Sequence, residues 1–364
     1  MRVLIYHTGM EWTGGARVAG AFGRLLASRG AKITTAVRPE SVVEERFATE
    51  GLDVVPLPAD PSVVDQSRRL RRIIKDYFIE VVIVTGSRAH LAAAWGMRLA
   101  GRGAVLRRVG AGDAIRLTTA DWQAGRLTPS GWIFASEAER RAANVPARGI
   151  PATVVPLGIE MAMHDTVRPL SRAALNLAGS GPTIVCVGDE RVRGRASTVL
   201  RALHLLLPRH PELRLVLVGR CTDDEDLQMH AASLGITRQV RFLGDRRDQL
   251  AILRSADLGW VLADGDDAAY ACLDFMALRV PVLAPSGTLA EQYVADGITG
   301  RLLVPDDGPG AAAAVAALLA RDDQRTTMGE AARARVARDH TEAMMADAAL
   351  AAVEIARDRT RWTR

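Results

Sequence analysis

Residues 258–284 read LGWVLADGDDAAYACLDFMALRVPVLA, and this stretch decides the fold class. An apolar run from Leu258 to Leu262 leads into an acidic turn, a helical stretch and a second apolar run from Val280 to Ala284. Neither run alternates with polar residues, which is typical of strands buried on both faces of a parallel sheet. Strand, helix and strand in this order predict a right-handed crossover unit.

The same alternation of short β-rich runs and longer helical stretches recurs along the whole chain. It predicts an α/β fold with two doubly wound, Rossmann-like domains in tandem. In the first half the runs are 3–6, 33–37, 54–57, 81–85, 105–109, 132–135 and 153–156, and in the second they are 184–187, 213–218, 240–243, 258–262, 280–284 and 301–304.

The boundary between the domains is expected in residues 158–182, which lack a strand pattern and end in the turn signal Gly179-Ser180-Gly181-Pro182. We therefore predict a first domain over 1–165 and a second over 166–340. Residues 341–364 are predicted to form a helical segment that packs back on the first domain. Residues 331–360 have the composition of one continuous helix.

Composition excludes several classes of protein. With 48% hydrophobic and 24% charged residues among 364, the chain has enough apolar material for a core and is not disordered. Aromatic residues make up only 4%, which argues against stacking on nucleic-acid bases. Three cysteines cannot make a disulfide framework, and the longest apolar run, 311–320, is too short to span a bilayer. We expect a cytoplasmic protein with no nucleic-acid partner.

Positive charge is concentrated in the first half. Residues 1–165 hold 22 lysines and arginines against 16 aspartates and glutamates, which suggests an anionic partner. Residues 68–77 (RRLRRIIKDY) combine an apolar stripe at helical spacing with a cationic remainder. Such a helix could associate weakly with the anionic inner face of a membrane. The alternative is an ordinary surface helix whose apolar side lies on the sheet.

A glycine-bearing turn follows the first predicted strand. Gly14 and Gly15 come just before a predicted helix, where glycine lets the backbone and the helix N–H groups approach a ligand closely. The alternative is a plain strand–helix turn. The spacing matches neither a Walker loop nor a dinucleotide fingerprint, so an oxidoreductase is not expected.

Two loops of the second half carry charges suited to a nucleotide. Arg191, Arg193 and Arg195 follow a predicted strand and could clamp a diphosphate, or they could simply be solvated. Asp264, Asp266 and Asp267 precede a helix and could cap it.

Asp274 interrupts the apolar side chains of the same helix, and a buried carboxylate needs a partner or a ligand hydroxyl. It lies eight residues after Asp266, about two helical turns or ~12 Å. Two carboxylates at this spacing could hold both ends of one extended polar ligand.

The order and spacing of several motifs resemble the GT-B glycosyltransferases, in particular family four of the retaining enzymes. The resemblance covers nearly the whole chain. The motifs are Gly14-Gly15, 155–160 (VPLGIE), 187–194, 217–219 (LVG), 240–244 (VRFLG), 255–258 (SADL), 297–305 (GITGRLLVP) and 328–333 (MGEAAR).

The resemblance implies a retaining transfer of a sugar from a UDP- or GDP-sugar in an interdomain cleft, without a cofactor or metal. The acceptor would be a glycan, a lipid-linked or a small molecule that enters from the first domain. By resemblance Asp266 contacts the transferred sugar and Asp274 the ribose. The remaining donor-binding residues implied are Gly14 and Gly15, Arg191, Arg193 and Arg195 at the diphosphate, Leu243 near the base, and Asp267 beside the diphosphate.

The chain departs from the family at the site itself. Two aspartates replace the family's glutamates, 267–269 (DAA) replaces Gly-Phe-Gly, and Asp189 replaces an arginine. The family's first-domain histidine has no match around Gly110. The rival reading is therefore a catalytically impaired GT-B protein that binds donor or acts as a scaffold for an active transferase. A sugar-nucleotide epimerase on the same fold fits the motifs less well.

Overall fold

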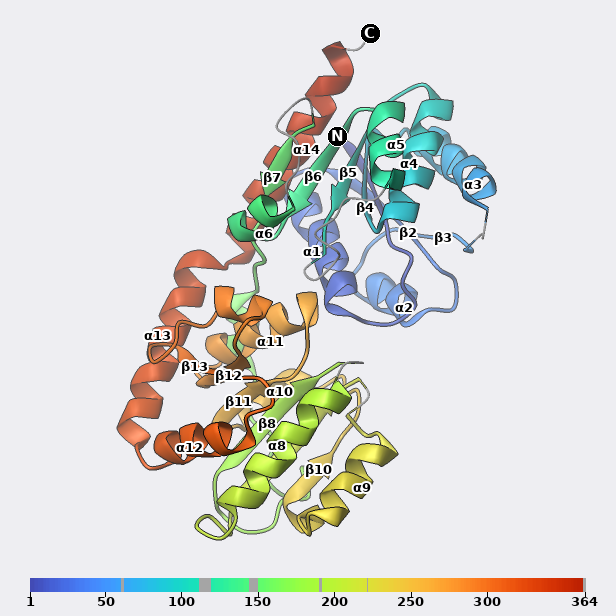
Figure 1. Cartoon of the computed structure of the whole chain (residues 1–364). Helices are drawn as coiled ribbons and strands as arrows, with labels where there is room; N and C mark the ends of the chain where they lie inside the picture. Colours follow the sequence, from blue (N-terminus) through green and yellow to red (C-terminus); the bar gives the residue numbers. More distant parts are fainter. Residues whose placement is uncertain (60–61, 111–118, 144–149, 190–191, 221, 363–364) are drawn as a thin grey trace. The chain divides into compact units, whose positions relative to one another are not determined.

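The computed structural model in Figure 1 describes residues 1–59, 62–110, 119–143, 150–189, 192–220 and 222–362. The chain divides into two compact units, one made of Met1–Gly158 with Glu342–Arg364 and the other of Ile159–Thr341. The expected boundary at residue 165 differs from this division, because residues 159–165 lie in the second unit.

The first unit is built on a seven-stranded parallel sheet with the order β3-β2-β1-β4-β5-β6-β7. Its strands are β1 (Arg2–Tyr6), β2 (Lys32–Val37), β3 (Val54–Pro56), β4 (Val81–Thr85), β5 (Ala104–Arg108), β6 (Ser130–Phe134) and β7 (Ala152–Val154). Its helices are α1 (Gly14–Ser28), α2 (Val42–Thr49), α3 (Val63–Asp76), α4 (Ser87–Ala100), α5 (Thr119–Leu127), α6 (Glu137–Ala142) and α14 (Glu342–Trp362).

The second unit is built on a six-stranded parallel sheet with the order β10-β9-β8-β11-β12-β13. Its strands are β8 (Thr183–Gly188), β9 (Arg214–Gly219), β10 (Val240–Phe242), β11 (Leu258–Val261), β12 (Val282–Pro285) and β13 (Gly300–Leu303). Its helices are α7 (Met161–Thr166), α8 (Val192–Leu206), α9 (Glu225–Ser233), η1 (Thr237–Gln239), α10 (Gln249–Arg254), α11 (Gly265–Ala277), η2 (Leu289–Gln292), α12 (Gly308–Leu319) and α13 (Asp322–Asp339). Each predicted apolar run coincides with a strand, so two doubly wound sheets in tandem are confirmed.

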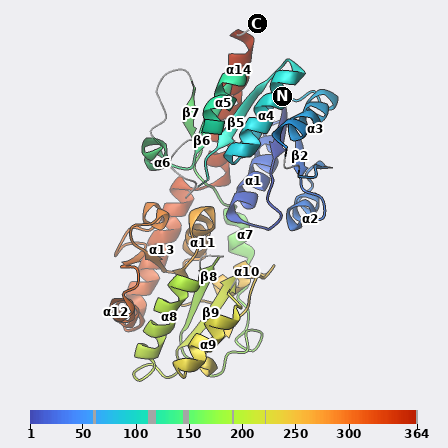
Figure 2. The ribbon, with the colours of Figure 1, turned by 45° about the vertical axis from the view of Figure 1, so that its right-hand side comes forward.

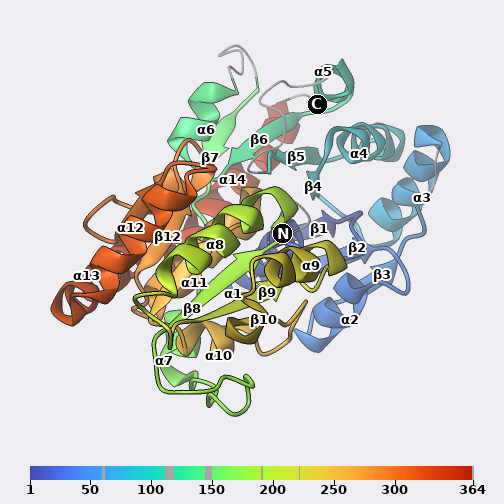
Figure 3. The same cartoon turned by 60° about the horizontal axis from the view of Figure 1, so that its bottom comes forward.

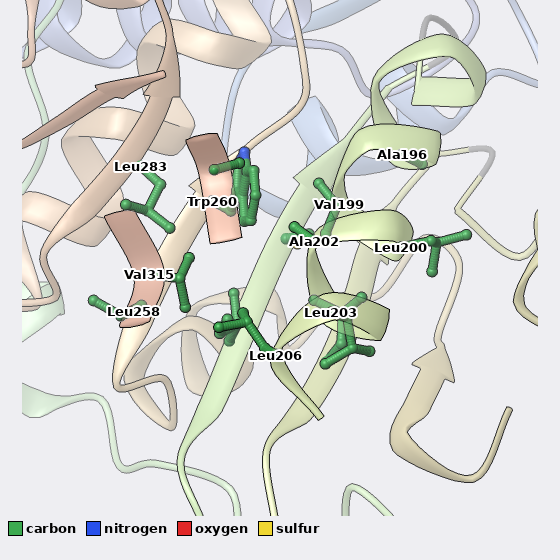
Figure 4. Close-up of a cluster of buried hydrophobic side chains, with 14 of the residues drawn as sticks. Ala196, Val199, Leu200, Ala202, Leu203, Leu206, Leu258, Trp260, Leu283 and Val315 are labelled. Atoms are coloured by element: carbon green, nitrogen blue, oxygen red, sulfur yellow. The ribbon is translucent and has the colours of Figure 1, made fainter. Parts of the chain in front are cut away.

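Helices cover both faces of the second sheet. α8, α9 and α12 pack together on one face (Figure 3), where Leu203, Leu206 and Trp260 belong to one buried apolar cluster (Figure 4). Gly259 faces the other side: a Cβ there would lie 2.5 Å from the ring of Phe275 on α11. The absence of a side chain at Gly259 therefore lets α11, which carries the candidate acids, pack directly on β11.

The predicted continuous helix over 331–360 is wrong, because α13 ends at Asp339 and α14 begins at Glu342. Between them the backbone N–H of Ile159 donates to the carbonyl of His340 at 3.0 Å, and Ile159 forms a parallel bridge with Thr341. This pairing holds the backbone extended where a helix would have to continue. α14 then packs on α1 and β5 in the first unit (Figure 2), with Arg24 and Glu342 joined by an ion pair of 3.1 Å.

Candidate functional site

The candidate site of the second unit lies at the carboxyl ends of its central strands. The order of the strands reverses between β8 and β11, and open parallel sheets bind ligands at such switch points. The loops after β8, β9 and β11 meet there. Each carries a charged residue that contacts another of these loops, helix α8 or helix α11.

The N-terminus of α11 carries three acids in different roles. Asp264 is the N-cap, and its side chain accepts a hydrogen bond from the backbone N–H of Gly265. Asp266 and Asp267 lie in the first turn, where the positive end of the helix dipole favours negative charge. Of the three acids, Asp264 is therefore the one that caps the helix. Asp266 is buried, with 9% of its surface exposed.

Arg195 braces the loop after β11. One terminal nitrogen donates to the carbonyls of Leu262 at 3.0 Å and Ala263 at 2.8 Å, and the other lies 3.3 Å from the Asp264 carboxylate. Of the other two predicted arginines, Arg191 lies outside the described residues, and Arg193 is described only as a backbone position within α8.

Asp189 joins the loops after β8 and β11. It is buried, and its Oδ2 accepts a hydrogen bond of 2.9 Å from the backbone N–H of Asp264. The resemblance predicts an arginine at this position. The residue present is instead an acid that joins two loops by a hydrogen bond.

Arg220 forms an ion pair with Asp267, the acid that replaces a family glycine. The Nη2 of Arg220 lies 3.1 Å from Oδ2 of Asp267, and the two side chains are 14% and 28% exposed. Sequence reasoning missed Arg220. The available signal was a cation directly after Gly219, at the end of a fully buried strand.

Asp274 is buried and hydrogen bonded to His164 on α7. Oδ1 of Asp274 lies 2.9 Å from Nε2 of His164, and the other ring nitrogen donates to the carbonyl of Glu160 at 2.8 Å. Because a carbonyl only accepts, Nδ1 carries a proton. The hydrogen bond between Nε2 and Asp274 needs a second proton, on either the nitrogen or the carboxylate oxygen. The pair is therefore either imidazolium with carboxylate or imidazole with carboxylic acid. His164 was also missed by sequence reasoning, because no local pattern marks it.

Leu243 follows the last residue of β10. Its backbone N–H donates to the carbonyl of Leu217 at 2.9 Å. The carbonyl of the next residue, Gly244, accepts from the backbone N–H of Gly219 at 2.9 Å. The backbone of Leu243 is thus tied to the end of β9, on the side of the sheet remote from β11.

In the first unit, the predicted glycine turn starts α1. Thr13 is the N-cap, and its hydroxyl accepts from the backbone N–H of Ala16 at 3.2 Å. Gly14 is buried and Gly15 half-buried in the first turn. Both glycines are therefore the first residues of the helix, and not part of the turn before it as the sequence analysis expected.

The first unit also holds a buried charged cluster around Asp121, which is fully buried. Asp121 accepts from the hydroxyl of Ser87 at 2.9 Å, lies 3.1 Å from Nδ1 of His90, and forms an ion pair with Arg107. The Arg107 guanidinium lies 5.6 Å from the ring centroid of Trp132. Burial lowers the pKa of His90, against the opposing effect of Asp121.

The basic helix α3 packs its apolar stripe inside the first unit. Leu70, Ile73 and Ile74 are buried, and α4 approaches so closely that a Cβ on Gly96 would lie 3.1 Å from that of Leu70. The cations remain outside: Arg68, Arg69, Arg71, Arg72 and Lys75 are exposed. The apolar stripe is therefore used in packing, and only an electrostatic contact with a membrane stays a prediction. Within the described part of the chain, no helix is both long and apolar enough to cross a bilayer.

A cavity of about 340 Å³ lies beside the candidate site and is lined in part by Arg195, Trp260 and Leu262. A larger one, of about 760 Å³, lies in the first unit beside the ends of α4 and α5 and includes Arg98 and Arg126. Those two arginines lie in the last turns of their helices, where a cation complements the helix dipole.

Comparison with known proteins finds similarity to one family of enzymes. Residues 167–335 match the family described as glycosyl transferases group 1. A phosphatidyl-myo-inositol mannosyltransferase of Mycobacterium leprae is 29% identical over 84% of this chain and 81% of its own length. The corresponding enzyme of Mycolicibacterium smegmatis is 31% identical over 56% of this chain, and a D-inositol 3-phosphate glycosyltransferase of Corynebacterium jeikeium is 31% identical over 48%. The chain spans about half the length of these last two relatives, 51% and 44%.

Solved structures share the fold. The HepE protein of Anabaena, crystallised with UDP and glucose, superposes with a TM-score of 0.81 at 16% identity over 98% of this chain and 100% of its own. A glycosyltransferase of Rickettsia africae gives a TM-score of 0.79 at 13% identity over 98% of each chain. The GT-B fold predicted from the motifs is thereby confirmed.

Proposed function

Because residues 167–335 match the group 1 glycosyl transferases, we propose that the chain belongs to this family and transfers a hexose from a UDP- or GDP-sugar to an acceptor hydroxyl with retention of configuration. The observation that carries the proposal is the position of α11. Its N-terminus, with Asp266 buried in the first turn, stands directly after β11 at the switch point of the sheet. Donor groups bound there would meet a helix N-terminus, which favours the negative charge of a diphosphate.

We assign Asp266 to the hydroxyls of the transferred sugar and Asp274 to the ribose. Burial of Asp266 supports its role, because a carboxylate with 9% exposure can hold a sugar hydroxyl out of competition with water. Asp274 would act from within its pair with His164, whose Nε2 fixes the direction of one carboxylate oxygen. We assign the diphosphate to Arg193 with Arg191 or Arg195, and the base to the backbone at Leu243. Gly14 and Gly15 of the first unit are proposed as further donor-binding residues, because glycine lets the backbone come close to a ligand.

The proposed reaction needs no protein nucleophile. The bond from the anomeric carbon to the diphosphate breaks, and the acceptor oxygen bonds to the same face of the sugar. The departing phosphate oxygen takes the acceptor proton. The protein then contributes positioning of the donor and stabilisation of charge on the leaving diphosphate, which are the large terms in such transfers. Metal independence is part of this proposal.

The acceptor is proposed to be a polyol or glycan, free or lipid-linked. Support comes from the names of the relatives, which act on phosphatidyl-myo-inositol or D-inositol 3-phosphate. The exposed cations of α3 suit a site of action at the cytoplasmic face of an anionic membrane.

A second candidate is a donor-binding protein without turnover. Two features favour it: Asp189 stands where the family has a cation and is engaged by the backbone of Asp264, and Asp267 adds a negative charge beside the diphosphate position. Such a protein would bind nucleotide and act through an active partner.

Thermal unfolding with UDP, GDP, ADP and TDP tests both candidates. A nucleotide at 100 times its dissociation constant should stabilise the second unit by about 2.7 kcal/mol. The preferred nucleotide then identifies the sugar donors to assay for transfer to inositol phosphates and glycans, with and without EDTA. If no nucleotide stabilises the protein, both candidates fail. Stabilisation without transfer from any matching sugar nucleotide would select the second candidate, and loss of transfer in EDTA would refute metal independence.

A further inference from the structure

We propose that Arg220 binds the diphosphate of the donor in this chain, and that Asp267 is its counter-ion when no donor is bound. The inference rests on the proposed function, because it assumes a nucleoside diphosphate at the switch point. It assigns a binding role to a residue outside the predicted group of Arg191, Arg193 and Arg195.

The sheet register brings Arg220 to the required place. β8 and β9 pair in parallel with Gly188 opposite Gly219, so the next residues, Asp189 and Arg220, emerge at the same level of neighbouring strands. Adjacent strands are only about 4.8 Å apart. The cation absent at Asp189 is therefore present one strand away.

The direction of the Arg220 side chain is equally specific. It contacts Asp267 in the first turn of α11, which follows β11, and β8 lies between β9 and β11 in the sheet. The ion pair therefore bridges the carboxyl end of β8. A diphosphate at the switch point would occupy this same region, in front of the N-terminus of α11.

The chemistry of the pair fits an exchange of anions. A guanidinium presents five N–H donors in a planar fork that suits phosphate as well as carboxylate. Its 14% exposure keeps it only partly hydrated, which strengthens an ionic contact relative to one in water. A diphosphate carries more negative charge than Asp267, and the carboxylate repels it. Neutralising Asp267 should therefore strengthen diphosphate binding.

Calorimetric titration with UDP and UMP, and with GDP and GMP, tests the inference on the full chain. Arg220→Gln should weaken binding of the diphosphate by about 10- to 100-fold, the effect of one lost charge-assisted hydrogen bond. It should change binding of the monophosphate, which lacks the outer phosphate, by less than about threefold. Arg220→Lys should restore part of the loss, and Asp267→Asn should raise diphosphate affinity about threefold or more. Arg246→Gln, which removes an exposed arginine paired with Asp248, is the matched control.

The outcomes separate this inference from the proposed function. If the unaltered protein binds a diphosphate and Arg220→Gln binds it equally well, Arg220 has no such role while the proposed function stands. Equal losses for diphosphate and monophosphate would show that Arg220 only supports the local structure, and would overturn the inference. Weaker binding in Asp267→Asn would refute the exchange. If the unaltered protein binds no nucleotide, the proposed function fails and takes this inference with it.

Discussion

Nε2 of His164 lies 2.9 Å from Oδ1 of Asp274, and both side chains are buried in the second unit. The contact links α7, just after the first unit ends, to the last turn of α11. One member of the predicted acid pair is therefore held by a protein partner, and the other, Asp266, lies in the first turn of the same helix. Variants of the two acids should consequently have different effects.

Asp274→Ala should destabilise the second unit strongly. It leaves His164 buried without its carboxylate, and breaking a buried pair costs about 3–5 kcal/mol. Asp274→Asn should cost less, about 1 kcal/mol, because its amide can donate to a neutral Nε2. Urea unfolding followed by a probe in the second unit measures both, with the half-exposed Asp248→Ala as control. Equal losses for Ala and Asn would contradict the hydrogen-bonded pair.

Asp266→Asn should retain folding and lose turnover. The proposed contact of Asp266 with the sugar would count mainly at the transition state, so we expect about a 100-fold lower rate and nucleotide affinity within about threefold. Asp264→Ala is the contrasting variant, because Asp264 is the N-cap and its loss should cost about 1 kcal/mol of stability. Steady-state assays and thermal unfolding measure the two effects. Full activity in Asp266→Asn would remove Asp266 from the site.

His7 should make the stability of the first unit depend on pH. Burial lowers its pKa from 6.5 to about 4, and among the described residues neither ring nitrogen has a hydrogen-bond partner. Between these values the unfolded chain binds the proton and the folded one does not, so stability falls as pH drops from 6.5 towards 4, by at most about 1.4 kcal/mol per pH unit.

Chemical unfolding at several pH values measures this slope. His7→Leu should flatten it, whereas His204→Leu, on an exposed histidine of the second unit, should leave it in place. An unchanged slope in His7→Leu would assign the dependence to other groups.

Asp121→Ala should destabilise the first unit by about 3–5 kcal/mol. It removes the carboxylate that compensates the buried Arg107 and accepts from Ser87. Asp76→Ala, at the exposed end of α3, should cost less than about 0.5 kcal/mol. Thermal unfolding of the two variants compares them directly. Similar midpoints would mean that the cluster contributes nothing to stability.

Neutralising α3 should reduce binding to anionic vesicles. Each exposed cation contributes about 1 kcal/mol at best, so Arg68→Gln, Arg69→Gln and Arg72→Gln together should weaken binding at low salt and abolish it near physiological ionic strength. Sedimentation with vesicles of neutral and of anionic lipid measures it, and Arg321→Gln with Arg338→Gln on the second unit is the control. Equal binding to both vesicle types would contradict an electrostatic contact.

The sequence alone determined the strands, their parallel arrangement and the division into two sheets. These follow from local patterns, because a strand buried on both faces must be apolar along its length and a parallel crossover needs an intervening helix. The sequence also located the acids of α11, since a strand–turn–helix junction is recognisable within a stretch of about twenty residues.

Only the tertiary structure decided which charges meet. His164 and Asp274 are 110 positions apart, and Arg220 and Asp267 are 47 apart, so no local spacing reveals either pair. The break between α13 and α14 has the same origin, because Ile159 pairs with Thr341 and overrides a strong local helix preference. Neighbours in the chain favour most helices and strands, whereas the partner of a buried charge, like the end of this helix, depends on how distant elements pack.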